Sequence, residues 1–214
     1  MNSSQNQEQA ALTHQRGADS ADSGPLYRTS LTDPLRIDEV KTGDAGGRIG
    51  LTFCPGKCGD SLAGRGWKRD LELDLDVVAQ WRADAVVTLI EAHEFPLLGV
   101  SSLGDQVRAH GIEWHHLPIT DAAPPDSRFE QGWQTSGPRL RGLLLQGGRV
   151  LIHCRGGLGR AGTVAARLLV ELGVQPGEAV ARVRSTRPGA IETPEQLSYV
   201  LNLSRLPENQ TGEF

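Results

Sequence analysis

The sequence has no long apolar run and no excess of basic charge. No stretch approaches the roughly 18 to 20 apolar residues that a membrane-spanning helix needs, and the N-terminus lacks the charged-then-apolar order of a secretory signal. The net charge is -4, whereas a general nucleic-acid binder needs a basic surface that displaces counterions. We therefore expect neither a nucleic acid nor a membrane as a partner.

Cysteine is also scarce, with three residues in the chain: Cys54, Cys58 and Cys154. An odd number without an export signal fits a reducing compartment better than a disulfide framework, so we expect a cytoplasmic protein with free thiols. The spacing of Cys54 and Cys58 invites a metal site, but no second Cys or His pair has zinc-like spacing. We expect no metal and no cofactor, and leave open a reversible disulfide that protects Cys154 from overoxidation.

Composition divides the chain into a central domain and two tails. Residues 1–24 are rich in Ser, Gln, Asn and Asp and bury too little apolar surface to offset the entropy of ordering. We predict a disordered N-terminal tail over 1–24, a single domain over 25–206 and a C-terminal tail over 207–214. The total of 214 residues, 38% of them hydrophobic, suits one domain with a sizeable core.

Strand and helix patterns alternate along the central domain. Apolar, β-branched runs predict strands, and runs with helical spacing predict helices between them. The strands are expected at 48–53, 85–90, 112–119 and 149–153, and the helices at 71–81, from Ser102 through Val107, from about 127, over 164–172, at 177–185 and at 194–206.

Two local features refine this pattern. Ser102 and Asp105 resemble a capping box at the start of one helix, and Gly137 with Pro138 should interrupt the helix that starts near residue 127. Strands that alternate with helices imply right-handed crossovers. The expected fold class is α/β, with a mostly parallel central sheet flanked by helices on both faces.

The run HCRGGLGR at residues 153–160 carries the chemistry. Cys154 ends a predicted buried strand, and a glycine-rich turn then enters a helix, which places the sulfur among backbone N–H groups near the positive end of a helix dipole. These surroundings favour the thiolate. Gly156, Gly157 and Gly159 can take positive φ and turn successive amides into one concavity, a nest that suits a tetrahedral dianion.

An arginine and an acid complete the predicted site. The planar guanidinium of Arg160 can donate two parallel hydrogen bonds to phosphate oxygens. A leaving oxygen needs a proton, and Asp121 is the candidate donor because it follows the strand at 112–119 and lies in a loop that contains Pro124 and Pro125. Asp126 is the fallback.

These residues resemble a known family. Cys154 and Arg160, framed by His153 and Gly157, match the Cys-x5-Arg signature of the protein tyrosine phosphatase superfamily. The resemblance is to the kinase-associated (cyclin-dependent kinase inhibitor 3 type) dual-specificity phosphatases and to the small atypical dual-specificity enzymes. It covers residues 48–203, and the stretches that carry it besides 153–160 are 94–100, 111–119 and 187–196.

The resemblance implies a phosphotyrosine phosphatase-like fold of dual-specificity size and a two-step reaction through a phosphocysteine, without metal. Cys154 would be the nucleophile, Asp121 the general acid and base, and Gln196 would help to place the hydrolytic water. His153 would support the loop. Phosphate would be bound by residues of one loop: Arg155, Gly156, Gly157, Leu158, Gly159 and Arg160. The implied substrate is a phosphorylated protein or peptide carrying phosphotyrosine, and phosphoserine or phosphothreonine stays open.

One departure from the family pattern concerns the residue after the arginine. The family has Ser or Thr there, whose hydroxyl hydrogen-bonds the cysteine sulfur, and this chain has Ala161. Thr163 lies too far along the helix to replace it. We therefore expect slow hydrolysis of the phosphoenzyme. This leaves open a phosphate-binding module with very slow turnover, besides a phosphatase of a non-protein ester and a rhodanese-like sulfurtransferase, which would not require Arg160.

Other polar residues have more ordinary interpretations. His115 and His116 are expected to form a partly exposed strand pair. Arg182, Arg184 and Arg187 can attract an acidic substrate, although solvated helix charges are the commoner explanation. Nothing in the sequence indicates an oligomeric state.

Overall fold

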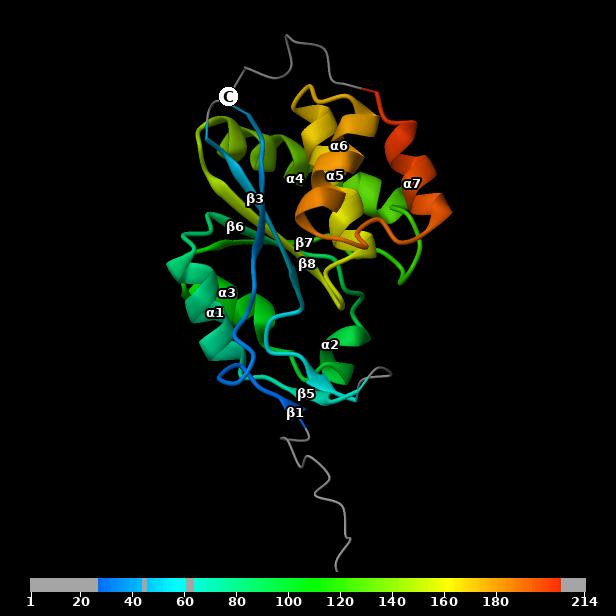
Figure 1. Cartoon of the computed structure of the whole chain (residues 1–214). Helices are drawn as coiled ribbons and strands as arrows, with labels where there is room; N and C mark the ends of the chain where they lie inside the picture. Colours follow the sequence, from blue (N-terminus) through cyan, green and yellow to red (C-terminus); the bar gives the residue numbers. More distant parts are fainter. Residues whose placement is uncertain (1–26, 44–45, 61–63, 205–214) are drawn as a thin grey trace, which may run out of the picture.

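The computed structural model describes residues 27–43, 46–60 and 64–204 (Figure 1). Both predicted tails, 1–24 and 207–214, lie outside the described residues. No helix within the described part of the chain has the length and apolarity to cross a bilayer.

A five-stranded sheet forms the centre of the domain. Its strand order is β2-β3-β8-β6-β7, and β2 is antiparallel to β3 while the other neighbours run parallel. The strands are β2 (Asp38–Lys41), β3 (Arg48–Phe53), β6 (Ala85–Thr88), β7 (Glu113–His116) and β8 (Arg149–Cys154). The predicted fold class, a mostly parallel sheet with helices on both faces, is confirmed.

Helices cover both faces of this sheet. On one face lie α1 (Leu71–Gln80) and α3 (Leu103–Ala109), at the lower left of Figure 1. The other face carries α4 (Ser127–Leu145), α5 (Gly159–Glu171), α6 (Pro176–Thr186) and α7 (Pro194–Leu201). Each strand-to-strand crossover therefore contains a helix, as parallel pairing requires.

The central strands are buried on both sides, which explains their continuous apolar sequence. In β8 the side chains alternate between two cores. Val150 and Ile152 pack with the helices α4 to α7, whereas Leu151 packs with the helices α1 and α3. A shift of one residue would turn every side chain of β8 to the opposite face of the sheet. Each side chain would then face the wrong core, so the register of β8 is fixed.

Several short elements were not predicted. A second sheet pairs β1 (Tyr27–Arg28), β5 (Gly66–Lys68) and β4 (Cys58–Gly59), and the helix α2 (Glu94–Leu97) follows β6. The antiparallel strand β2 was also missed. Elements of two to four residues are too short for a period to be visible in the sequence.

Two helix predictions need correction. Ser102 precedes α3 but its side chain makes no cap hydrogen bond; its hydroxyl accepts from Gln106 Nε2 at 2.8 Å, so the capping box is wrong. The helix predicted over 194–206 ends at Leu201.

The predicted interruption at Gly137 and Pro138 is also wrong, because α4 runs through both residues. A proline removes one backbone hydrogen bond, but the buried face of α4, with Trp133, Leu140 and Leu144, packs on the core on either side of it. Gly137 gives room to Trp133, whose Nε1 would lie 2.6 Å from an added Cβ.

A polar chain crosses the sheet from β7 to β8. Trp114 Nε1 donates to Thr88 Oγ1 at 2.9 Å, and Thr88 Oγ1 lies 2.8 Å from His153 Nε2. Thr88 and His153 are fully buried. The predicted supporting position of His153 is thus inside the sheet, one residue before Cys154.

Acid should destabilise the fold through His153. Burial lowers the pKa of His153 to about 4 from 6.5. Between these values the unfolded state binds more protons than the folded state, so stability falls as the pH drops. Going from pH 7 to pH 5 should cost about 2 kcal/mol of unfolding free energy from this group. Urea unfolding at both pH values measures it, and an equal pH dependence in His153→Gln would contradict the assignment.

Candidate active site

The loops that follow the parallel strands meet at one edge of the sheet. Cys154 ends β8, the segment with Lys57 follows β3, the segment with Glu94 follows β6, and the loop with Asp121 follows β7. In parallel α/β sheets this edge is the usual place of a ligand site. The site is therefore assembled from residues nearly one hundred positions apart.

The loop from Cys154 to Arg160 surrounds the cysteine sulfur. Cys154 is 3% exposed, and the N–H of Gly157 donates to its Sγ at 3.2 Å. Gly157 has φ 72°, and a Cβ there would lie 2.3 Å from the carbonyl oxygen of Thr52. Gly156 and Gly159 do not adopt positive φ, contrary to the prediction. Only Gly157 needs glycine for its φ.

Two cations hold the carbonyl groups of this loop from outside. Arg187 donates from Nε to the oxygen of Gly157 at 2.9 Å and from Nη2 to the oxygen of Gly156 at 3.2 Å. Lys57 Nζ donates to the oxygen of Arg155 at 3.3 Å. A trans peptide points its carbonyl and its N–H in opposite directions. The N–H groups that follow these carbonyls are therefore turned away from the two cations, as the Gly157 N–H bond to the sulfur illustrates.

Arg160 is held by a buried carboxylate. Its side chain is 2% exposed, and Nη1 and Nη2 donate to the two oxygens of Glu94 at 2.6 and 3.0 Å. Nη1 also donates to the oxygen of Ile119 at 3.1 Å. Burial alone would raise the pKa of Glu94, but the hydrogen bonds from Arg160 and from the Glu91 N–H lower it. Glu94 is therefore a carboxylate, and Arg160 stays charged.

Asp121 lies beside this arginine. Its Oδ1 is 2.9 Å from Arg160 Nη2, and its side chain is 65% exposed. The next residue, Ala122, has φ 59°, an uncommon value for a residue with a Cβ. The structure thus brings Asp121 together with Arg160 at the predicted nest.

Asp126, the fallback acid, has a different job. Its Oδ1 accepts from the N–H groups of Arg128 and Phe129 at 3.0 and 3.1 Å, which makes it the N-cap of α4. The hydrogen bond from the Phe129 N–H is the largest cause that lowers the pKa of Asp126, and the bonds from Arg128 lower it further. A capping carboxylate that stays ionised is a poor proton donor.

Gln196 is buried and fully engaged with the backbone. Its Oε1 accepts from the N–H of Glu192 at 3.0 Å, and its Nε2 donates to the oxygen of Ala123 at 3.2 Å. Gln196 and Thr193 also form a capping box at the start of α7. Gln196 therefore links the late loop to the loop of Asp121, and its role in placing water stays a prediction.

The two residues considered for the missing hydroxyl after Arg160 are Ala161 and Thr163. Ala161 is fully buried. The hydroxyl of Thr163 donates to the oxygen of Gly159 at 2.8 Å, a bond within the helix α5. Thr163 is thus committed to its own helix and does not replace the missing hydroxyl.

The other two cysteines belong to no cluster of potential metal ligands among the described residues. Within the described ranges no cluster of three His, Cys, Asp or Glu side chains is arranged to hold a metal ion. Cys54 is buried, and burial raises the pKa of its thiol. Cys58 is partly buried, with its sulfur 3.6 Å from the oxygens of Gly56 and Arg69. All three thiols are free.

The predictions for the other polar residues hold for the two histidines and for one of the three arginines. His115 and His116 are a partly buried strand pair, as predicted. Of the three arginines, Arg182 pairs with Glu178 on its own helix. Arg184 and Arg187 instead hold backbone oxygens of the late loop and of the Cys154 loop.

Sequence reasoning missed three residues that shape this site: Glu94, Lys57 and Arg187. The Nζ of Lys57 lies 4.0 Å from the ring centre of Trp67 and 4.5 Å from that of Phe53, and burial lowers its pKa to about 8. Glu94 had a usable signal, because a buried arginine needs a carboxylate and Glu94 follows a strand of the same sheet edge.

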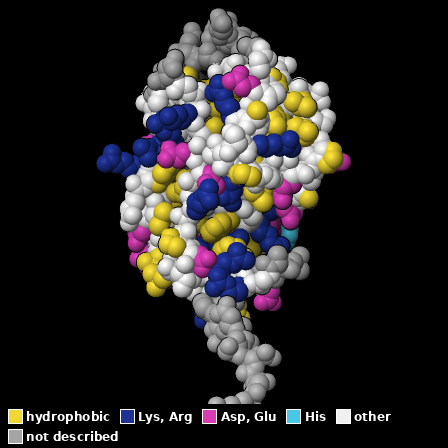
Figure 2. Space-filling model, in the orientation of Figure 1, with side chains coloured by type: hydrophobic (Ala, Val, Ile, Leu, Met, Phe, Trp, Pro, Cys, Tyr) yellow, Lys and Arg dark blue, Asp and Glu magenta, His cyan; other side chains and the backbone are white. Residues whose placement is uncertain are grey.

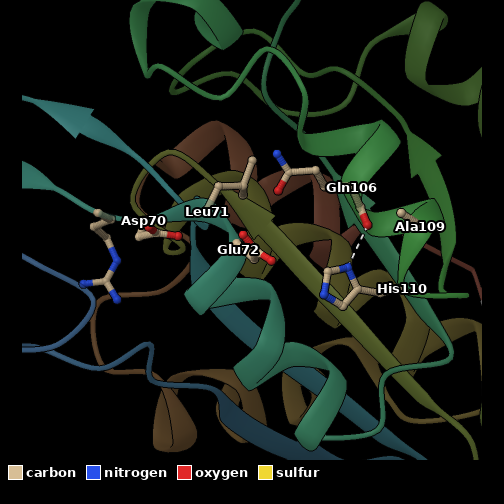
Figure 3. A pocket seen from close by; sticks show the side chains of 7 residues that line it. Asp70, Leu71, Glu72, Gln106, Ala109 and His110 are labelled. Carbon is tan, nitrogen blue, oxygen red and sulfur yellow. Dashed lines mark hydrogen bonds between the residues drawn. The ribbon is translucent and has the colours of Figure 1, made fainter.

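A separate pocket of about 560 Å³ lies between α1 and α3 (Figure 3). Its lining includes Asp70, Gln106 and His110, and none of the lining residues belongs to the Cys154 loop.

Figure 2 shows Lys and Arg scattered among Asp and Glu on the face it draws, without one continuous basic area.

Comparisons with known proteins agree with this geometry. Residues 69–200 match the family model described as the Swiss Army Knife protein DSP-PTPase phosphatase domain, PTP-SAK. The chain belongs to this family of dual-specificity-type protein tyrosine phosphatase domains. This membership removes the sulfurtransferase hypothesis.

Curated relatives and solved structures point the same way. Cyclin-dependent kinase inhibitor 3 of Rattus norvegicus is 32% identical over 136 residues, 62% of this chain and 63% of that protein. The chain therefore spans less than two thirds of this relative. Human protein tyrosine phosphatase type IVA 3 is 34% identical over 89 residues, 42% of this chain and 49% of the relative.

Two solved structures share the fold over most of their length. One is a kinase-associated phosphatase whose catalytic-site cysteine is replaced by serine, with a TM-score of 0.67 and 27% identity, covering 78% of this chain and 92% of that one. The other is Tk-PTP in its active form, with a TM-score of 0.55 and 34% identity, covering 77% and 95%.

Proposed function

We propose that this chain is a cysteine-dependent protein phosphatase that hydrolyses phosphotyrosine esters, with phosphoserine and phosphothreonine as further substrates to test. The observation that carries the proposal is the convergence of three groups. The sulfur of Cys154 accepts an N–H from its own loop, Arg160 is fixed by Glu94, and Asp121 lies 2.9 Å from Arg160. Nucleophile, phosphate clamp and proton donor thus lie at one edge of the sheet.

The first step transfers the phosphoryl group to the protein. The thiolate of Cys154 attacks phosphorus and forms an S–P bond, while the P–O bond to the leaving group breaks. Asp121 gives its proton to the leaving oxygen. Arg160 and the loop amides from Arg155 to Gly159 stabilise the charge on the equatorial oxygens.

The second step returns the cysteine. A water attacks the phosphorus of the phosphocysteine, Asp121 takes the proton of that water, and the S–P bond breaks to release inorganic phosphate and the thiolate. Gln196 lies close to Gly159 and is our candidate for orienting this water. No metal or cofactor takes part in either step.

We assign this activity to one domain over 25–206, which contains every residue of the site. We place the protein in the cytoplasm, because three free cysteines suit a reducing compartment. The substrate class is taken from the family and from relatives such as human protein tyrosine phosphatase type IVA 3.

Replacing the acid should separate Asp121 from Asp126. We expect Asp121→Asn to lower kcat about 10²- to 10⁴-fold on a phosphotyrosine peptide. The loss should be smaller on para-nitrophenyl phosphate, whose good leaving group needs little help from an acid. Steady-state hydrolysis of both substrates measures this, and Cys154→Ser should abolish both.

Asp126→Asn is the matched control, because asparagine is as good an N-cap as aspartate. It should stay within about 2-fold of the parent, since the cap remains. A large loss of kcat in Asp126→Asn, with no loss in Asp121→Asn, would make Asp126 the general acid instead of Asp121. Hydrolysis by Cys154→Ser would contradict a mechanism through a phosphocysteine intermediate.

The same Cys154→Ser protein tests the substrate class. It should retain phosphotyrosine peptides in a pull-down more strongly than phosphoinositide vesicles, because Arg160 and the loop can still hold the anion. Preferential retention of the vesicles would favour a phosphatase of a non-protein ester.

Ala161 supports a second candidate, a phosphate-binding module with very slow turnover. Without a hydroxyl near the sulfur the thiolate is a poorer leaving group, so phosphoenzyme should accumulate. Rapid-quench hydrolysis should show a burst in the parent, and Ala161→Ser should raise the steady rate. No burst, together with an unchanged rate in Ala161→Ser, would contradict this expectation.

A further inference from the structure

A second carboxylate lies on the phosphate loop. Oε2 of Glu192 accepts the N–H of Gly159 at 2.7 Å. Gly159 is the first residue of α5, and the N-cap Leu158 makes no side-chain cap. The free N–H at this helix start therefore finds its acceptor 33 residues further along the chain.

The sequence around Glu192 holds this contact in place. Ile191 has φ 59°, a rare value for a β-branched residue. Its carbonyl accepts from Arg184 Nη2 at 2.9 Å, and the N–H of Glu192 donates to Gln196 Oε1 at 3.0 Å. The backbone is thus fixed on both sides, while the side chain of Glu192 is exposed and can leave the loop.

Gly159 is shaped to admit this carboxylate. A Cβ at Gly159 would lie 2.5 Å from Glu192 Oε2 and 2.9 Å from Gln196 Oε1. Gly159 does not have a positive φ, so its missing Cβ serves here to let the two side chains approach the backbone. Under the proposed function, the amide of Gly159 is one of the donors to the substrate phosphate. Glu192 therefore occupies a position on the loop that a phosphate oxygen needs.

We propose that the carboxylate of Glu192 competes with phosphate for the Gly159 amide and weakens the binding of free anions. The inference rests on the proposed function. A carboxylate at the start of α5 interacts favourably with the helix dipole, and its negative charge repels an entering dianion. The loop then releases inorganic phosphate more readily than a loop with all its amides free.

The alternative is that Glu192 only caps α5. Glu192→Gln separates the two, because glutamine keeps an oxygen that accepts the Gly159 N–H but removes the charge. Glu195→Gln is the matched control. Glu195 is exposed, lies three residues further on in the first turn of α7, and loses the same charge.

The experiment measures the Kd of inorganic phosphate by calorimetry and its Ki against para-nitrophenyl phosphate. We expect Glu192→Gln to bind phosphate about 5-fold more tightly than the parent, the upper end of the charge effects at exposed helix ends. Glu195→Gln should stay within about 2-fold. The difference between Glu192→Gln and the parent should shrink at about 1 M salt, where charges on exposed groups are screened.

Equal phosphate affinity in all three proteins would overturn the proposal and leave Glu192 as a cap. If hydrolysis still depends on Cys154 in that case, the proposed phosphatase function stands without the proposed role of Glu192. If the parent and Glu192→Gln neither bind phosphate nor hydrolyse para-nitrophenyl phosphate, both proposals fail. Thermal unfolding of the variants checks that the fold is intact, and tighter binding in Glu192→Gln excludes simple loss of structure.

Discussion

The site depends on the buried ion pair between Arg160 and Glu94. Two charges at this depth cost several kcal/mol to desolvate, and removing one partner of such a pair costs about 3–5 kcal/mol. The bonds to Glu94 and Ile119 use both hydrogens of Nη1 and one of Nη2. The edge with Nε and the second Nη2 hydrogen remains for a phosphate, beside the Asp121 carboxylate. Arg160 is thus held in one orientation, which is what the proposed phosphate clamp requires if it is to act without reorganisation.

The central strands β3, β6 and β8 could be predicted from sequence, because they are largely buried and their sequences are mainly apolar runs. The bounds of β3 were predicted correctly, and those of β8 to within one residue. The edge strand β2 and the small sheet of β1, β5 and β4 could not be predicted, since two to four residues carry no period and depend on partners far along the chain. The continuity of α4 through Pro138 was missed for a related reason: tertiary packing outweighs one lost hydrogen bond.

Cys154, Arg160 and Asp121 were predicted because spacing and strand ends are local signals. The residues that orient them are not local. Glu94 lies 66 positions before Arg160, and Arg187 pairs with Asp38 across 149 positions. No short pattern links such residues, although a buried arginine does imply that a carboxylate exists somewhere. The sequence therefore indicates the candidate reacting groups, whereas the residues that hold them in place are visible only in the fold.

Two carboxylates of the chain lie at the candidate site, those of Asp121 and Glu192. Asp121 lies 2.9 Å from Arg160 Nη2, and Glu192 accepts the Gly159 N–H, a donor that the substrate phosphate would use under the proposed function. Each carboxylate lies next to a residue with φ 59°, Ala122 and Ile191. Strain of this kind persists only where the surroundings impose it, and here Thr193 and Gln196 bond to the loop of Ala122, while Arg184 bonds to Ile191. Under the two proposals above, a bound dianion takes the Gly159 N–H from Glu192, while Asp121 stays beside Arg160 as the donor to the leaving oxygen. On that proposal the loop binds free phosphate less tightly and keeps its acid, which favours turnover over product retention.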